Sequence, residues 1–456
     1  MVQWVVDNKK RIPADLKAAV GKLHQLDTQA ARLLWVHWDE LPPLLVAGVP
    51  LQRTRFEELV AQLYAYGFTP RIKITPEMSA VLAQMEADQK RAFALALWEQ
   101  WQAAREPARG HWCMSLLCWW AGDTAVLALL SRLPQWQKRK LDPLITTTLF
   151  GLLEIKSDLA LMILCHWARF APFLRLRRLA EDTLGRMAFK IDEIVDKVVP
   201  DGGLDHSGRR PFMIGGQPYT LVLRDDLTLM FYDQENHAAA EFLKETTPAL
   251  DQPWWVCPEI IKLVIALQTQ RLERAMMSQQ RWSTAEFEAH LLAHPILWRM
   301  IRPLVWGCYD EAQQLVQCFR LDEEGRPIDL DERPLLVADY PFIGLVYPQT
   351  LDLLESGRWG TALAEDELWP LFSQLGRELY RLQAHELDLH ELIRFKGQAF
   401  DPFTLVSTLE AQGWCRGIVV EHGVFHSHVK WFGDQQTAVL VYDKPIDISL
   451  DAALPL

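Results

Sequence analysis

A repeat of 35 residues in the front half of the chain constrains its fold more than any other feature. Asp88, Asp123 and Asp158 stand 35 residues apart, and each opens an apolar helical run. Positions further along keep the same spacing, namely Ala94, Leu129 and Leu164; Leu95, Leu130 and Cys165; Met114, Leu149 and Leu184; and Leu117, Leu152 and Met187. A period of this length, built from two amphipathic helices, is typical of HEAT-like α-solenoids. We therefore expect stacked helix pairs, with each aspartate capping its helix.

The helical pattern stops near residue 195, where Pro200, Gly202 and Gly203 follow. This predicts a helical-repeat domain over residues 1–195 and a second domain over residues 196–456. Pro- and Gly-separated segments near the N-terminus predict further helices, which either extend the same stack or cap it.

Strands and helices alternate in the predicted second domain. Residues 209–233 turn at Gly215-Gly216 and at Asp225-Asp226, which predicts a three-stranded meander. Further predicted elements are helices at 258–280, 283–299, 366–382 and 402–412, strands from 303 and at 342–347, a hairpin turning near Glu324-Gly325, and a β region at 417–442 turning at Gly433-Asp434. The predicted fold is mainly α, with an N-terminal HEAT-like α-solenoid followed by a mixed α+β domain that contains β-meanders.

Charge and cysteine content exclude several classes of protein. The formal net charge is −12, and an acidic surface repels phosphate backbones, so we do not expect nucleic-acid binding. The seven cysteines are scattered and form no C-x-x-C pair, which argues against a disulfide framework and a structural zinc site. No leader-like N-terminus and no apolar stretch of about 18 residues is visible, so we expect a cytoplasmic protein without membrane spans.

A series of short segments in the back half carries a family resemblance. In chain order they are QRLERAMMSQQRW, FEAHLLAHPILWRMIRPLVWGCYD, CFRLDEEG, LVYP, FSQLGRELYRL, RFKG and GWCRG. Their order and spacing resemble the bacterial molybdate-metabolism-regulator (MolR) family, and the similarity covers about residues 190–450. One departure is Tyr347, which stands where relatives tend to have a histidine before the proline of the LVYP segment.

The resemblance implies a large domain of unknown function with no established active site. Relatives often carry a WGR domain, which this sequence does not show, and often stand beside an AAA+ ATPase or a von Willebrand A-type protein. These arrangements suggest stress or defence responses. The resemblance therefore implies an adaptor or effector that acts with such a partner.

Two histidines near the C-terminus form the best candidate for metal binding. His426 and His428 form an H-x-H pattern on a predicted strand, which would place both imidazoles on one face. Such a pair suits zinc, and Glu421 or Asp434 would supply a further ligand. Edge hairpins also carry histidine pairs that bind nothing, so no cofactor is predicted and zinc is the alternative.

A cluster of arginines gives the best candidate for ligand binding. Arg271 and Arg274 lie at i and i+3 on one predicted helix face, with Trp282, Arg299 and Arg302 following in the sequence. Two guanidinium groups on one face can clamp a carboxylate or a phosphate. The alternative is a structural network of ion pairs with nearby carboxylates, namely Glu273, Glu286 and Glu288.

No P-loop, dinucleotide-binding or nucleophile-elbow motif is present, so catalytic residues are unknown. The leading hypothesis is a non-enzymatic interaction or regulatory protein that docks a protein partner through the solenoid. The first alternative is an enzyme or small-anion sensor with an arginine-lined pocket in the back half. The second is a molybdate-linked transcriptional regulator, which the acidic charge and the missing basic recognition helix disfavour.

Overall fold

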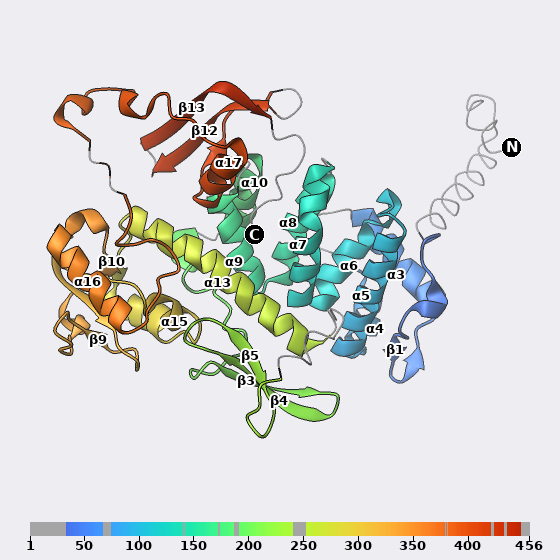
Figure 1. The fold of residues 1–456 in the computed structure, drawn as a ribbon. Helices are drawn as coiled ribbons and strands as arrows, with labels where there is room; N and C mark the ends of the chain where they lie inside the picture. The colour runs from blue at the N-terminus through green and yellow to red at the C-terminus, as the bar shows by residue number, and fades with distance from the viewer. Residues whose placement is uncertain are drawn as a thin grey trace. The chain divides into compact units, whose positions relative to one another are not determined.

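The computed structural model describes residues 33–66, 74–139, 142–171, 174–186, 191–239, 252–378, 380, 382–420, 424–432 and 436–447. The chain divides into two compact units, Met1–Ala160 and Leu161–Leu456 (Figure 1). Helices dominate the described part of the first unit, whereas the second combines helices with antiparallel sheets. The prediction of a mainly α chain with an α+β back half is therefore confirmed. None of the described helices has the length and apolar character needed to cross a bilayer.

In the described part of the first unit, a short hairpin precedes a series of helices in the sequence. The hairpin pairs β1 (Leu45–Val46) with β2 (Val49–Pro50). The helices are α3 (Arg53–Tyr66), α4 (Pro76–Ala83), α5 (Ala87–Ala103), α6 (Trp112–Ala121), α7 (Asp123–Lys138) and α8 (Asp142–Ile155). Helix α6 packs against α5 and α8, and α7 packs against α8. Trp98, Trp101 and Trp136 are fully buried in mutual contact, with ring centroids of Trp98 and Trp101 5.2 Å apart.

The three repeat aspartates lie in the first turns of α5, α7 and α9 (Asp158–Phe170), so the predicted helix starts are confirmed. The predicted capping role is wrong at two of them. The N-cap residue of α5 is Glu86, whose side chain makes no capping hydrogen bond. At the start of α9 the capping residue is Ser157, whose hydroxyl accepts from the Ala160 amide at 3.2 Å. Inside the first turn a carboxylate still meets the positive end of the helix dipole. The segment before residue 33 and the repeat position Met187 lie outside the described residues.

The second unit starts with helices and continues with a meander. Helices α10 (Leu174–Gly185) and α11 (Ile191–Ile194) precede strands β3 (Arg209–Ile214), β4 (Gln217–Leu223) and β5 (Leu229–Tyr232). The strands pair in sequence order, and Gly215 and Gly216 turn with φ of +58° and +80°, as the sequence predicts. Helices give way to strands between α11 and β3, close to the predicted boundary at 195, whereas the compact units divide at 160/161.

The long helix α13 (Pro253–Met277) is followed by a five-stranded antiparallel sheet in the order β6-β10-β7-β8-β9. The strands are β6 (Trp282–Ser283), β7 (Trp306–Tyr309), β8 (Leu315–Leu321), β9 (Pro327–Ile328) and β10 (Phe342–Leu345). The hairpin of β8 and β9 confirms the turn predicted near Glu324-Gly325. The helix predicted at 283–299 is not continuous. The structure has three helical segments there, α14 (Thr284–Glu286), the π-helical η4 (Phe287–Leu292) and α15 (Leu297–Ile301), with a break at Pro295 between the last two.

The helix predicted at 366–382 is wrong, because the described residues of that range form neither helix nor strand. The helix lies earlier, at α16 (Leu353–Glu365), where the Asp352 carboxylate accepts from the Glu355 amide at 2.7 Å and caps the first turn. It ends before Glu367, which has a φ of +54°, and Pro370 prevents its continuation. Two glycines inside α16 weaken its helical signal in the sequence.

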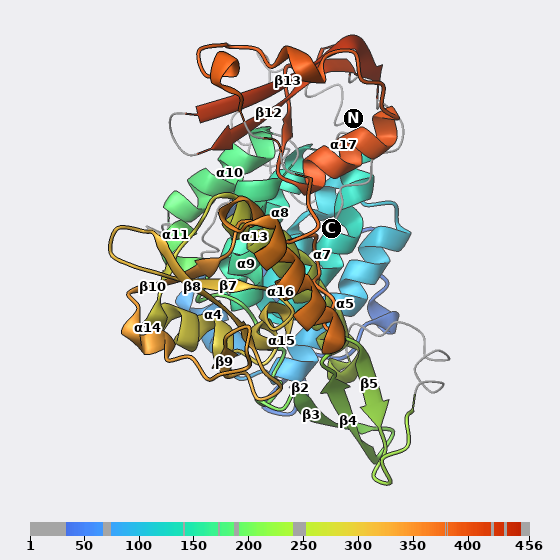
Figure 2. The same ribbon diagram turned by 60° about the vertical axis from the view of Figure 1, so that its left-hand side comes forward.

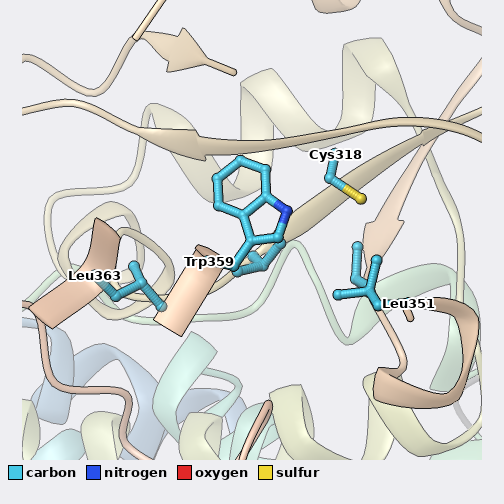
Figure 3. Packing of buried hydrophobic residues seen from close by; sticks show 6 residues of the cluster. Cys318, Leu351, Trp359 and Leu363 are labelled. Atoms are coloured by element: carbon cyan, nitrogen blue, oxygen red, sulfur yellow. The ribbon is translucent and has the colours of Figure 1, made fainter. Parts of the chain in front are cut away.

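Packing explains why α16 forms despite its glycines. Trp359 and Leu363 stand one turn apart, are buried, and belong to a cluster with Val305, Cys318, Val346 and Leu351. Figure 3 shows the Trp359 indole between Leu363 on one side and Cys318 and Leu351 on the other. Burial of these side chains supplies the stability that helix propensity does not.

The chain closes the second unit with a small α+β piece, here called the C-terminal lobe. It comprises α17 (Pro402–Ala411), β11 (Cys415–Arg416), β12 (Val424–Phe432) and β13 (Gln436–Asp447), with the strands in the order β11-β12-β13. Val406, Phe425 and Ile446 form its own core. Both views place the lobe beside α10 (Figures 1 and 2). The helix predicted at 402–412 is confirmed, and the turn predicted at Gly433-Asp434 lies outside the described residues.

Candidate functional site

A small pocket in the second unit gathers side chains from five segments of the chain. They come from the end of α9, the last two turns of α13, the loop after α16, the end of α17 and strand β12. The lining residues are Phe170, Gln270, Glu273, Arg274, Met277, Arg377, Gln412 and Lys430. The pocket measures about 280 Å³, a volume that includes open solvent, and about 20 Å³ of space is available to the centre of a water-sized sphere. This space suits a water molecule or one small polar group, and a larger ligand would extend into solvent.

Arg274 is held at the rim of the pocket by two neighbours on α9. Its guanidinium lies 5.4 Å from the centre of the Phe170 ring, and its Nη1 donates to the Arg169 carbonyl at 3.2 Å. Stacking on an aromatic face fixes the plane of the guanidinium. Arg274 therefore presents a guanidinium of fixed orientation at the pocket.

Arg377 reaches the pocket from the loop after α16 and is fixed by three contacts. Its Nε donates to the Ser373 carbonyl at 3.1 Å, its Nη1 to Met277 Sδ at 3.2 Å, and its Nη2 to the Glu273 carboxylate, with which it forms an ion pair. Glu273 and Met277 are one turn apart on α13. These contacts attach the loop to the helix and place a second guanidinium beside Arg274.

Lys430 comes from strand β12 and is the third cation of the pocket. Its Nζ donates to the Gln412 carbonyl at 3.0 Å, at the C-terminal end of α17. Burial lowers the pKa of Lys430 to about 8, and the nearby Arg274, Arg177 and Arg377 lower it as well, against the opposing effect of Glu273. The charged form of this lysine is therefore destabilised in the absence of a ligand.

The charges that line the pocket are unbalanced. Among the described lining residues, three are cations, Arg274, Arg377 and Lys430, and one is a carboxylate, that of Glu273, which is bound to Arg377. An excess of positive charge with guanidinium donors is the arrangement that binds carboxylates and phosphates. Phe170 and Met277 add apolar surface beside the charged groups.

The sequence-predicted residues Arg271 and Trp282 lie elsewhere, in a buried cluster around Asp196. Arg271 forms an ion pair with the Asp196 carboxylate and donates to Gln268 Oε1 at 2.6 Å. The Trp282 indole donates to Asp196 Oδ2 at 3.0 Å. Of the two arginines on the predicted helix face, only Arg274 lines the pocket, and the carboxylate that pairs with Arg271 is not one of those named from the sequence.

Arg299 and Arg302 also lie away from the pocket. Both are buried and lie 3.4 Å from the carboxylate of Asp225, in the turn between β4 and β5. The Arg299 guanidinium lies 4.6 Å from the centre of the Trp298 ring, and its Nη1 donates to the Pro295 carbonyl at 2.6 Å. These two side chains join α15 to the meander.

The structure does not bring His426 and His428 together. The pairing of β12 with β13 shifts register between Phe425 and Ser427, so His426 is exposed while His428 is fully buried against Phe425. A bulge of this kind breaks the alternation of faces on which the H-x-H reading depends. Glu421 and Asp434 lie outside the described residues, among which no group of three or more His, Cys, Asp and Glu side chains is placed to hold a metal ion.

His428 belongs instead to a buried polar chain within the C-terminal lobe. Its Nδ1 lies 2.5 Å from the Tyr442 hydroxyl and its Nε2 3.7 Å from the Glu410 carboxylate, which accepts from Arg416 Nε at 2.5 Å. Glu410 is 3% exposed and His428 0%. These polar contacts join β12, the strand that also carries Lys430, to α17 and β13.

Sequence reasoning missed Arg377, Gln412 and Lys430. Arg377 lies in the segment FSQLGRELYRL, and Lys430 follows His428 by two residues, but nothing in either pattern shows that they approach α13. The pocket depends on tertiary contacts between residues as far apart in the chain as Phe170 and Lys430.

Comparison with known proteins places most of this pocket in a recurring sequence region. Residues 257–414 match a domain of unknown function (DUF4132). That region contains Gln270, Glu273, Arg274, Met277, Arg377 and Gln412, while Phe170 and Lys430 lie outside it. The chain is also 26% identical over 344 residues to the uncharacterized protein YehI of Escherichia coli (strain K12), a match that covers 72% of this chain and 28% of YehI. No solved structure matches the chain.

Proposed function

We propose that the chain is a regulatory protein that binds a small anion, a carboxylate or a phosphate, in the pocket between α13, the Arg377 loop and the C-terminal lobe. The observation that supports this function is the convergence of Arg274, Arg377 and Lys430 on one pocket in the described part of the chain. The rigid attachment of both guanidinium groups adds to it, because preorganised donors lose little entropy on binding.

Removal of Arg274 is expected to weaken anion binding at least about tenfold, because a charge-assisted hydrogen bond contributes about 1.5–3 kcal/mol. The Arg274→Gln variant would be compared with the parent chain by calorimetric titration at low ionic strength. The ligands are inorganic phosphate, sulfate, molybdate and citrate. The matched control is Arg333→Gln, since Arg333 forms a surface ion pair with Asp331 and its side chain is 74% exposed. Absence of saturable binding to the parent chain, or equal weakening in both variants, would contradict the proposal.

A second candidate function is docking of a protein partner. We propose that the helices of the first unit continue as a HEAT-like solenoid, which would give a long surface for such docking. A separate observation supports partner binding by the second unit. Large apolar side chains stay exposed along the segment from Trp369 to Phe403, among them Trp369 at 75%, Leu387 at 67%, Ile393 at 66% and Phe400 at 62%. An accumulation of exposed apolar groups is typical of interaction surfaces.

Replacing Leu387 and Ile393 with glutamate is expected to reduce partner capture at least tenfold, because charged residues are unfavourable in the desolvated core of an interface. The measurement is quantitative mass spectrometry of proteins that co-purify with the tagged chain from its native host. Val316→Glu serves as control, since Val316 is 53% exposed on strand β8, outside that segment. If a partner co-purifies at the parental level with both the Leu387 and Ile393 double variant and the Val316→Glu variant, docking through this segment is ruled out.

A further inference from the structure

Strand β13 lies at the edge of the sheet in the C-terminal lobe. Among the described strands it pairs with β12 alone, and at twelve residues it is the longest of them. An edge strand presents a row of backbone N–H and C=O groups that can bind another extended chain. The outer side of β13 is therefore a surface on which an added strand would find backbone partners.

Part of β13 lacks the features that protect a sheet edge. Proteins commonly protect such edges with charges, prolines or irregular pairing. On β13 these features lie towards the C-terminal end, where Asp443, Lys444 and Pro445 occur and the pairing with β12 is interrupted. Residues 437–441 have the sequence TAVLV, which contains no charge, proline or glycine and pairs regularly with β12. This stretch is here called the open edge.

Exposed apolar side chains lie along the open edge. Val439 is 56% exposed and Val441 is 70% exposed. Directly opposed residues of an antiparallel pair lie on the same face, so Val439 shares its face with Val429, and Thr437 shares it with Trp431. Trp431 is itself 39% exposed. This face, here called the outer face, therefore presents apolar side chains to solvent up to the edge of the sheet.

The order of side chains along the open edge makes it complementary to itself. If a second copy pairs antiparallel about a twofold axis at Val439, then Val439 faces Val439 of that copy and Thr437 faces its Val441. The outer face then holds a row of four valines, Val429 and Val439 of each copy. Opposed β-branched residues stabilise antiparallel sheets. A twofold contact requires such self-complementarity, because both copies use the same surface.

We infer that β13 is a self-association surface, at which two copies of the chain pair through residues 437–441 into a six-stranded antiparallel sheet. On each side this sheet ends in β11, which is only two residues long, so association through strand pairing stops at two copies. The contact goes beyond the proposed anion binding and does not depend on it. The pocket residue Lys430 pairs with Ala438 and therefore lies on the opposite face of β12 from Val429.

Sedimentation equilibrium of the full chain measures this association. A ladder of five residues is smaller than a standard protein interface, so we expect a dimer with a dissociation constant on the order of 10 μM. Val441→Lys places a charge on the outer face beside the axis and is expected to raise that constant at least about tenfold. The matched control is Val316→Lys, since Val316 is 53% exposed on β8, which has a strand on both sides, and this variant should keep the parental constant. A parent chain that stays monomeric at about 100 μM, or equal constants in the two variants, would overturn the inference.

Disulfide formation tests the register of the two strands. All seven native cysteines are buried, so mild oxidation can be directed to cysteines introduced on the outer face. Val439→Cys is expected to cross-link with itself, because directly opposed Cα atoms lie about 4.5–5.5 Å apart, within the range of a disulfide. Thr437→Cys alone is expected to stay unlinked, since its two copies would lie about 13 Å apart along the strands. A mixture of Thr437→Cys and Val441→Cys should cross-link, whereas self-linking of Thr437→Cys at the rate of Val439→Cys would contradict pairing about Val439.

Circular dichroism of each variant distinguishes lost association from unfolding. Val439 and Val441 are both exposed in the single chain, and the lobe core consists of Val406, Phe425 and Ile446. The substitutions are therefore expected to leave the fold of the lobe intact while they change its association.

Discussion

Replacing Asp196 with alanine is expected to lower the free energy of unfolding of the second unit by about 3–5 kcal/mol, because it leaves a buried guanidinium without its partner. The Arg271 side chain is 9% exposed and that of Asp196 is 14% exposed, so solvent cannot replace the lost interaction. The substitution also removes the acceptor of the Trp282 indole, whose side chain is buried on strand β6. The measurement is urea unfolding followed by tryptophan fluorescence.

Two comparisons show whether the buried charge is the cause. Asp331→Ala removes a carboxylate that pairs with Arg333 and Arg358 at the surface, where its side chain is 53% exposed, and should cost less than about 1 kcal/mol. Adding Arg271→Met to Asp196→Ala removes the stranded charge and is expected to recover part of the loss. An Asp196→Ala loss no greater than that of Asp331→Ala would show that the cluster is not structural. Sulfate affinity of the folded Asp196→Ala chain should stay within about twofold of the parent, because Asp196 does not line the pocket.

The sequence predicts those parts of the fold that local chemistry determines. Apolar periodicity locates α5, α7 and α9, and the paired glycines at 215 and 216 locate the turn of the meander. The position of α16 was missed because two glycines weaken its local signal, while the packing of Trp359 and Leu363 that stabilises it is tertiary. Between Phe425 and Ser427 the pairing partner moves from Ile446 to Val441, so three extra residues of β13 interrupt the register, and no periodicity in the sequence reveals such an irregularity.

The candidate site was predicted only in part, for a related reason. The helical spacing of Arg271 and Arg274 is visible in the sequence, but the three-residue separation rotates them far enough to reach different neighbours. Arg271 meets Asp196, and Arg274 meets Phe170. Lys430 and Arg377 join Arg274 through contacts between distant segments, so the excess of positive charge could not be read from any one stretch of the chain.

Sulfate affinity is expected to fall on the order of 100-fold between pH 8 and pH 10.5. The pKa of Lys430 in the ligand-free protein is about 8, below the usual 10.5 of a lysine, chiefly because of burial. A bound dianion stabilises the protonated form and raises this pKa, so binding above pH 8 requires uptake of a proton. Affinity is therefore highest below pH 8 and decreases by up to about tenfold for each pH unit above it. Sulfate suits the titration because its own charge does not change in this range, as that of phosphate does.

The stability of the ligand-free chain should change with pH in the opposite direction. Because the folded pKa of Lys430 is depressed, the unfolded chain binds more protons between about pH 8 and pH 10.5, and the free energy of unfolding rises with pH in that interval by the contribution of this group. Lys430→Met should remove both dependences, leaving weak sulfate binding that varies little with pH. Calorimetric titration and urea unfolding at matched pH values would measure the two profiles. Parallel slopes, or an unchanged sulfate profile in Lys430→Met, would show that another group controls the pocket. Opposite slopes that vanish together in Lys430→Met would identify Lys430 as the residue that couples anion binding to folding.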